Sequence, residues 1–228
     1  MKTIYNILLF ACLILAFSSC HSTEDEPISG AFYSENFVQA YIIPDRMEIS
    51  VRDYGHLQSF IYVKFYGTEI DNMSDAHEEQ FSLYSQKYGD THYNQKLVPF
   101  TNWAMGEDIQ TIDIRCDKDI DSEHPTGTSL NDVIKLFAAS PYRFIQNDYK
   151  KLDDYQIPED IEGLSFREGY YPVYKLLSDV TVSDLTLLAY DYYLDILPSL
   201  STGEYNFTIT VKFENGRILT GTVKYVAE

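Results

Sequence analysis

The sequence predicts a mainly β fold, an antiparallel β-sandwich with one short helix and long tyrosine-rich loops. Three observations lead to this prediction. Apolar and polar residues alternate over 205–213 and again over 219–225, which is the period of strands with one buried face. Further stretches show the same alternation and are dominated by β-branched and aromatic residues, the types that favour strands. Only one segment, about 129–139, has a clear helical period.

The first nineteen residues differ from the rest of the chain. Lys2 precedes an unbroken apolar run from Ile7 to Phe17, and two small residues follow the run. This order predicts a signal peptide over 1–19, because the run is shorter than the roughly 20 residues that cross a bilayer. The ending Phe17-Ser18-Ser19-Cys20 resembles the bacterial lipobox, which implies lipidation of Cys20 and a membrane as partner. The alternative is a plain secretory signal in which Cys20 has no role.

Residues 20–29 are expected to form a flexible tether, because they are polar, charged and poor in apolar side chains. Within them, Glu24, Asp25 and Glu26 look like the acidic export signal of Bacteroidetes lipoproteins. That likeness implies display on the outer face of the outer membrane, and the alternative is a solvated spacer. Residues 30–228 are expected to form a single β-rich domain.

Charge and cysteine content exclude several classes of protein. With 17 basic and 35 acidic residues the net charge is −18, which repels phosphate backbones, so no nucleic acid is expected as a partner. Cys12 would leave with the signal peptide and Cys20 would carry lipid. Cys116 would then be alone, which excludes an intramolecular disulfide and a four-cysteine zinc site. It alternates in phase with two isoleucines and is expected to be a small buried hydrophobe.

Strands are expected, in chain order, over 37–43 (ending at Pro44), 46–52, 60–66, 112–116 and 186–196. The helix at about 129–139 rests on Ser129 as a cap and on an apolar stripe that ends before Pro141. The stretches 67–108 and 142–178 show no clear period and are expected to be long loops.

The last two strands are expected to form a hairpin, and their register can be predicted. A two-residue Asn-Gly turn would pair Val211 with Thr220 and so mix the two faces. A three-residue loop, 214–216, keeps apolar residues together and places Gly216 in the left-handed region of a bulged turn. It pairs Val211 with Leu219, Phe207 with Val223, and Tyr205 with Tyr225.

The segment Gly127-Thr128-Ser129-Leu130-Asn131-Asp132 and the closing hairpin over 203–225, taken with the signal, resemble uncharacterised Bacteroidetes surface lipoproteins. The resemblance implies an immunoglobulin-like β-sandwich. It carries no catalytic residues that could be transferred to this chain.

No catalytic motif is present, and no cofactor is expected. The segment 77–81 begins like a zinc-protease helix, but Phe81 stands where the second histidine is needed. Asp117, Asp119 and Asp121 have the spacing of calcium-loop positions 1, 3 and 5, yet Thr128 replaces the glutamate at position 12. The three carboxylates are therefore interpreted as a solvated acidic turn, with a loop calcium site as the alternative.

Tyrosine is unusually frequent, with 20 in the chain against one tryptophan. Tyrosine and tryptophan offer rigid amphipathic surface that suits recognition. Tyr84, Tyr88, Tyr93 and Trp103 are the candidate binding surface, because they lie together in a stretch without assigned strands. The alternatives are tyrosines on the faces of sheets and a Trp103 that belongs to the core.

These observations predict an outer-membrane, surface-exposed lipoprotein that acts as a non-catalytic binding module for extracellular glycan or protein. One alternative is a structural subunit of a surface appendage, although the chain has no Lys or Arg between Cys20 and Arg46 at which such subunits are cleaved. The other is a hydrolase that uses paired carboxylates, which a sequence rich in acidic residues does not reveal.

Overall fold

The computed structural model describes residues 31–53, 59–99, 101–152, 167–197 and 200–227. Phe32–Glu228 form one compact unit. Cys20 and the acidic residues Glu24, Asp25 and Glu26 lie outside the described residues, as do the whole of the expected signal peptide and tether.

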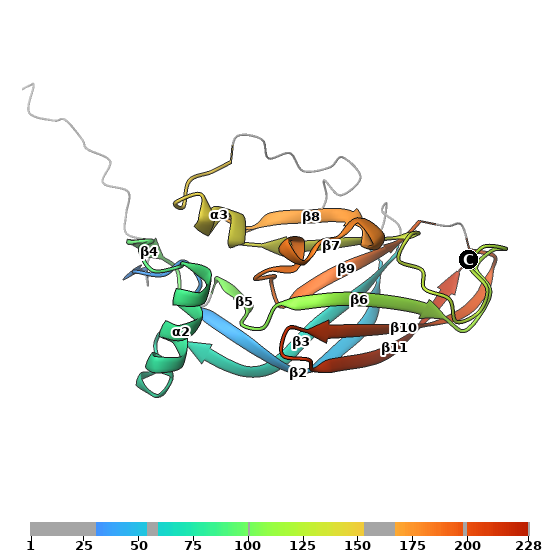
Figure 1. Ribbon diagram of the computed structural model, residues 1–228, viewed down its shortest axis with the longest axis horizontal. Helices are drawn as coiled ribbons and strands as arrows, with labels where there is room; N and C mark the ends of the chain where they lie inside the picture. The colour runs from blue at the N-terminus through green and yellow to red at the C-terminus, as the bar shows by residue number, and fades with distance from the viewer. Residues whose placement is uncertain (1–30, 54–58, 100, 153–166, 198–199, 228) are drawn as a thin grey trace, which may run out of the picture. The chain divides into compact units, whose positions relative to one another are not determined.

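Within the described residues, the strands form two main sheets and a small pair (Figure 1). The six-stranded sheet has the order β5 (Trp103–Met105), β2 (Ala40–Arg52), β3 (Phe60–Asp71), β9 (Asp191–Ile196), β7 (Ile134–Ser140), β8 (Tyr171–Leu176). The three-stranded sheet has the order β11 (Ile218–Ala227), β10 (Gly203–Phe213), β6 (Ile109–Cys116). The small pair joins β1 (Phe32–Ser34) to β4 (Gln95–Leu97). Neighbouring strands are antiparallel, except that β5 runs parallel to β2.

The main core lies between the two sheets. Alternate residues of β3, β6 and β10 are buried in one hydrophobic cluster, and the rings of Phe65 and Phe213 meet across it at 5.8 Å between centroids. Cys116 is 4% exposed in this cluster, and burial raises the pKa of its thiol. The mainly β prediction and the buried position of Cys116 are thus confirmed. The immunoglobulin-like assignment stays a prediction.

The closing hairpin has the predicted register. Val211 pairs with Leu219, Phe207 with Val223, and Tyr205 with Tyr225. Gly216 has φ of +84°, and the loop is closed by two hydrogen bonds, from Gly216 N to Phe213 O and from Phe213 N to Arg217 O, each 2.9 Å. The bulged three-residue loop is therefore confirmed.

The prediction of a helix over about 129–139 is wrong, because Ile134–Ser140 form the strand β7. This strand is paired on both sides, with β8 and β9, and most of its side chains are buried. A central strand of this kind has an apolar run instead of an alternation, which resembles a short helical stripe. Ser129 caps no helix; its hydroxyl donates to Asp113 Oδ1 at 2.6 Å.

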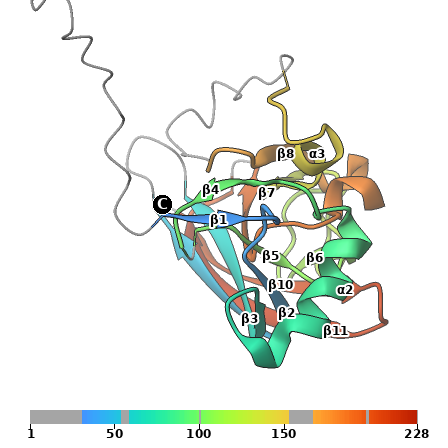
Figure 2. The same ribbon diagram turned by 90° about the vertical axis from the view of Figure 1, so that its left-hand side faces the viewer.

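The helices lie in the stretches that were expected to be loops. Among the described residues they are α2 (Glu78–Tyr88) and α3 (Tyr142–Gln146). The described 3₁₀ turns are Asp75–His77, Leu177–Asp179 and Val182–Leu185, of which the last lies outside both stretches. α2 packs against β2 and β3 (Figures 1 and 2). The strand expected over 186–196 begins only at Asp191.

The two strands expected over 37–43 and 46–52 are one strand, β2, so their separation at Pro44 is wrong. β2 pairs with β3 throughout, and the register shifts where Pro44 faces Gly67 and Arg46 faces Tyr66. Asp45 is the extra residue of this β-bulge, a position in a sheet that tolerates the missing N–H of a proline. A side chain at Gly67 would place Cβ 1.8 Å from the Ile43 carbonyl oxygen, so only glycine allows this close approach.

Candidate functional site

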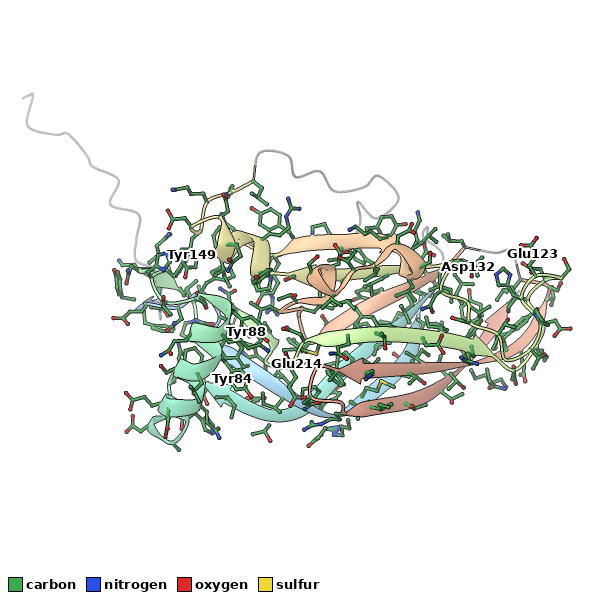
Figure 3. All side chains as sticks on the ribbon, in the orientation of Figure 1. Tyr84, Tyr88, Glu123, Asp132, Tyr149 and Glu214 are labelled. Atoms are coloured by element: carbon green, nitrogen blue, oxygen red, sulfur yellow. The ribbon has the colours of Figure 1, made fainter. Side chains whose placement is uncertain are left out.

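The structure divides the four predicted surface aromatics among different environments. Tyr88 is 2% exposed and stacks on Tyr41 at 5.9 Å between ring centroids, so its prediction as a surface residue is wrong. Tyr84 lies on α2 with Tyr88 and is half-buried against the same ring, at 5.3 Å (Figure 3). Both tyrosines therefore hold α2 on the sheet.

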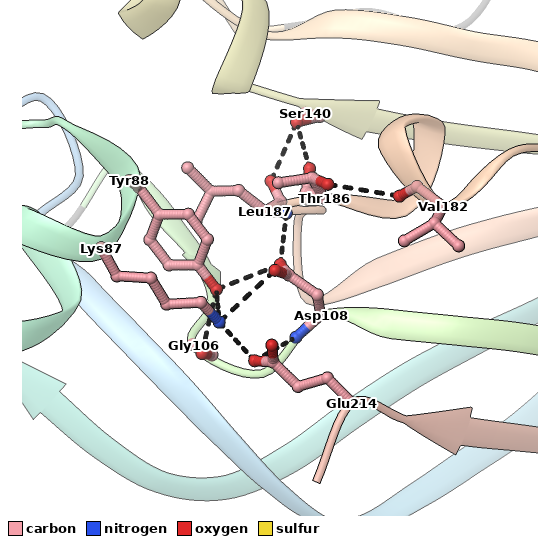
Figure 4. Close-up of polar contacts among 9 residues, drawn as sticks. All are labelled: Lys87, Tyr88, Gly106, Asp108, Ser140, Val182, Thr186, Leu187 and Glu214. Atoms are coloured by element: carbon pink, nitrogen blue, oxygen red, sulfur yellow. Dashed lines mark hydrogen bonds and ion pairs between the residues drawn. The ribbon is translucent and has the colours of Figure 1, made fainter.

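A polar network fixes the end of α2 (Figure 4). The Tyr88 hydroxyl lies 3.0 Å from both the Gly106 carbonyl oxygen and Asp108 Oδ1. Burial, with the neighbouring Asp108 carboxylate, raises the pKa of Tyr88, so its phenol stays protonated. Lys87 Nζ pairs with Asp108 Oδ2 at 3.4 Å and also with Glu214. Lys87 thus joins α2 to Asp108, directly before β6, and to Glu214 in the β10–β11 loop.

Tyr93 lies beside a different pocket. Its half-buried ring meets Phe37 at 5.3 Å and Tyr149 at 5.2 Å, in edge-to-face contacts. These rings line a pocket of about 580 Å³ that does not include Trp103. Tyr93 and Trp103 therefore do not form one surface.

Trp103 lines a separate groove of about 490 Å³, which we call the Trp103 groove. Its half-buried indole lies 5.9 Å from the ring of Tyr190, with the two planes tilted by 52°. Both residues are held through their main chains: Tyr170 Oη donates to the Trp103 carbonyl at 2.9 Å, and Phe65 N donates to the Tyr190 carbonyl at 2.8 Å. The aromatic walls of the groove are thus built on backbone that is fixed by hydrogen bonds, in β5 for Trp103 and directly before β9 for Tyr190.

The β2 bulge supplies the polar side of the Trp103 groove. Asp45 and Arg46 line it at the bulge, and the Arg46 guanidinium lies 4.3 Å from the centre of the Tyr66 ring. Lys64 Nζ lies 4.8 Å from the same ring centre and 5.4 Å from that of Tyr190. Glu69 is the second acidic residue of the lining. The groove therefore combines aromatic faces with hydrogen-bonding groups of both charges, and β-bulges often place side chains next to such sites.

The indole of Trp103 has an unmet hydrogen-bond donor. Its Nε1 atom is buried and has no acceptor among the described residues. Leaving such a donor unpaired costs about 1–3 kcal/mol.

The three aspartates with calcium-loop spacing do not converge. Asp117 accepts hydrogen bonds from Asn206, Asp119 from Thr126, and Asp121 from His124, and these bonds lower the pKa of each carboxyl. In the part of the chain that the structure describes, no group of three His, Cys, Asp or Glu side chains could hold a metal ion. The loop is thus held together by its own hydrogen bonds.

None of the helices in the described ranges has the length and apolar character needed to cross a bilayer. Comparisons of the chain with protein-family models, with curated proteins and with solved structures give no match.

Sequence reasoning found Trp103 but missed the residues around it. Arg46, Lys64, Tyr66 and Tyr190 come from β2, β3 and the segment before β9. The available signal was Pro44-Asp45 inside an otherwise strand-like run, since a proline there indicates a bulge.

Proposed function

We propose that the chain is a lipid-anchored, surface-displayed module that binds glycan without chemical turnover, and that the Trp103 groove is its binding site. One observation carries the proposal: the sole tryptophan shares a concave groove with Tyr190 and with charged side chains of both signs. Concave sites with aromatic walls and a few polar groups are typical of small-ligand binding.

A sugar ring matches this arrangement because it has apolar C–H faces and a rim of hydroxyl groups. The faces can pack on Trp103 and Tyr190, whose rings bury a large area at low entropic cost. Asp45 and Glu69 can accept hydrogen bonds from hydroxyl groups, and Arg46 can donate to ring or hydroxyl oxygens. A cavity of about 490 Å³ suits one or two sugar units better than the broad, flat contact of a protein partner.

The proposed location of the module follows from the features expected at the amino terminus. Lipid on Cys20 holds the chain at the outer membrane, and Glu24, Asp25 and Glu26 direct it to the outer face. There the groove meets extracellular polysaccharide.

The test uses the purified chain from residue 21 onward. A glycan array selects ligands, and each is then titrated while the emission of the single tryptophan is recorded. We expect a bound glycan to change Trp103 emission, and Tyr190→Ala to weaken binding about tenfold, equivalent to about 1.4 kcal/mol.

The matched control is Tyr33→Ala, because Tyr33 is 64% exposed and lies outside the groove. Circular dichroism checks that both variants are folded. The proposal fails if no glycan binds, or if Tyr190→Ala binds as tightly as Tyr33→Ala.

A further inference from the structure

The pocket beside Tyr93, which we call the Tyr93 pocket, differs from the Trp103 groove in its charge. Among the residues that the structure describes, its charged lining residues are Lys96, Lys151, Arg167 and Glu168, three cations and one anion. This is the reverse of the chain as a whole, which has a net charge of −18. A local excess of positive charge in a strongly acidic protein indicates a site for a negatively charged group.

The aromatic wall of the Tyr93 pocket is rigid. The ring of Phe37 lies 4.9 Å from Phe144, and Tyr149 lies 5.2 Å from Tyr93. Behind the wall, the fully buried Asp90 accepts hydrogen bonds from Phe37 N at 2.8 Å and from Tyr149 Oη at 3.0 Å. The buried carboxylate thus fixes two of the rings against which a ligand would pack.

The cations of the pocket retain capacity to bind a ligand. Lys151 pairs with Glu168 at 2.8 Å, but both side chains are about three-quarters exposed, so solvent competes with the pair. Arg167 donates one N–H to the Thr101 carbonyl, and a guanidinium has five. The ammonium of Lys96 has no partner among the described residues.

We propose that the Tyr93 pocket binds an anionic sugar unit, one that carries a carboxylate or a sulfate ester. The ring packs on the half-buried face of Tyr93, and the anionic group pairs with Arg167 and Lys96. A guanidinium binds carboxylate and sulfate oxygens through paired N–H donors, and a nearby ammonium adds a point charge. At about 580 Å³ the pocket has room for the unit together with its neighbour in a chain. An anionic-sugar site in the Tyr93 pocket goes beyond the function proposed for the Trp103 groove, because it would be a second binding site, selective for negatively charged sugars.

The test is calorimetric titration of the purified chain with D-glucuronate, with glucose 6-sulfate and with neutral D-glucose. The first two probes distinguish a carboxylate from a sulfate as the preferred group. We expect at least one anion to bind at least tenfold more tightly than glucose, and Arg167→Gln and Lys96→Gln each to reduce that preference at least fivefold.

Lys150→Gln is the matched control, because Lys150 is a neighbouring exposed lysine that pairs with Asp148 and does not line the pocket. It should leave the preference unchanged. Tyr190→Ala, which removes a wall of the Trp103 groove, should also leave glucuronate binding intact. The proposal for the Tyr93 pocket can therefore be contradicted without contradicting the proposal for the Trp103 groove, and the reverse also holds.

Three results would overturn the proposal. The first is equal affinity for glucose and both anions, and the second is an effect of Lys150→Gln as large as that of Lys96→Gln. The third is binding of an acidic peptide, such as oligoglutamate, more tightly than either anionic sugar, which would identify the pocket as a protein-binding site. Thermal unfolding of each variant ensures that the comparison is made between folded proteins.

Discussion

At the residue scale, His124 is a titratable residue that lines neither the Trp103 groove nor the Tyr93 pocket. Its buried imidazole lies between two carboxylates, with Nδ1 2.8 Å from Asp121 Oδ1 and Nε2 3.2 Å from both oxygens of Asp132. Hydrogen bonds to Asp132 and then Asp121 raise the pKa of the imidazole above its ordinary value of about 6.5. Asp132 and Glu123, the residue before His124, are labelled in Figure 3.

This raised pKa predicts how stability depends on pH. A histidine that binds its proton more tightly in the folded state stabilises the protein below the unfolded pKa, and the contribution is lost as the pH rises through the folded pKa. We therefore expect His124→Gln to lower the unfolding temperature at pH 5.5 and to have a smaller effect at pH 8.5. Thermal unfolding of both proteins across this range measures the difference. A constant difference, or one that grows with pH, would show that the imidazolium does not provide the stabilisation.

Individual residues also show why the candidate site could be predicted only in part from the sequence. Trp103 could be singled out because it is the only residue of its type. Tyr190 lies far from it in sequence and reaches it only through the pairing of β2, β3 and β9. Such long-range pairing is set by the whole sheet, and local periodicity contains no information about it. Tyr88 was misplaced for a related reason, since its burial depends on the docking of α2.

At the element scale, the β10–β11 hairpin depends on one backbone conformation. Gly216 has φ of +84°, and a Cβ added there would meet nothing within 4 Å. A substitution is therefore penalised through the backbone alone, without a steric clash. We expect Gly216→Val to lower the free energy of unfolding by about 1–2 kcal/mol, because a β-branched residue is disfavoured in the left-handed region.

Gly216→Asn is the control, because asparagine enters the left-handed region far more readily than valine. Urea denaturation should rank the proteins as glycine first, asparagine second and valine last. If valine and asparagine were equivalent, the bulged loop would not impose the conformation that the register requires.

The hairpin was predictable from sequence because everything that defines it is local: two alternating strands and the loop between them. β7 was not predictable in the same way. It pairs with β8 and β9, and its residues Ile134, Leu136 and Ala138 are buried in the main core, so its pattern reflects partners that are distant in sequence. β2 combines both cases, because its local alternation predicts a strand, whereas the bulge at Asp45 depends on the pairing of β2 with β3.

At the scale of the whole molecule, the basic residues can be divided between the Trp103 groove, the Tyr93 pocket and structural ion pairs. Five of the chain's 17 basic residues line the Trp103 groove or the Tyr93 pocket. Others are committed to structural pairs, as Lys87 is to Asp108 and Glu214. The excess acid elsewhere keeps the protein soluble and repels anionic surfaces. The described lining of the Tyr93 pocket, with three cations and one anion, thus departs from the acidic balance of the chain, whereas that of the Trp103 groove has two charges of each sign.

The net charge of the chain also bears on the prediction that lipid on Cys20 anchors it to a membrane. A chain with a net charge of −18 gains nothing from adsorption to anionic lipid, so we expect any retention at a membrane to depend on acyl chains on Cys20. We expect Cys20→Ala to abolish incorporation of labelled fatty acid and to move the protein from the membrane fraction to the precursor or released fraction. Cys116→Ala is the control, because that thiol is buried in the core and should leave labelling unchanged. Labelling and membrane retention that persist in Cys20→Ala would show that the protein is held by other means.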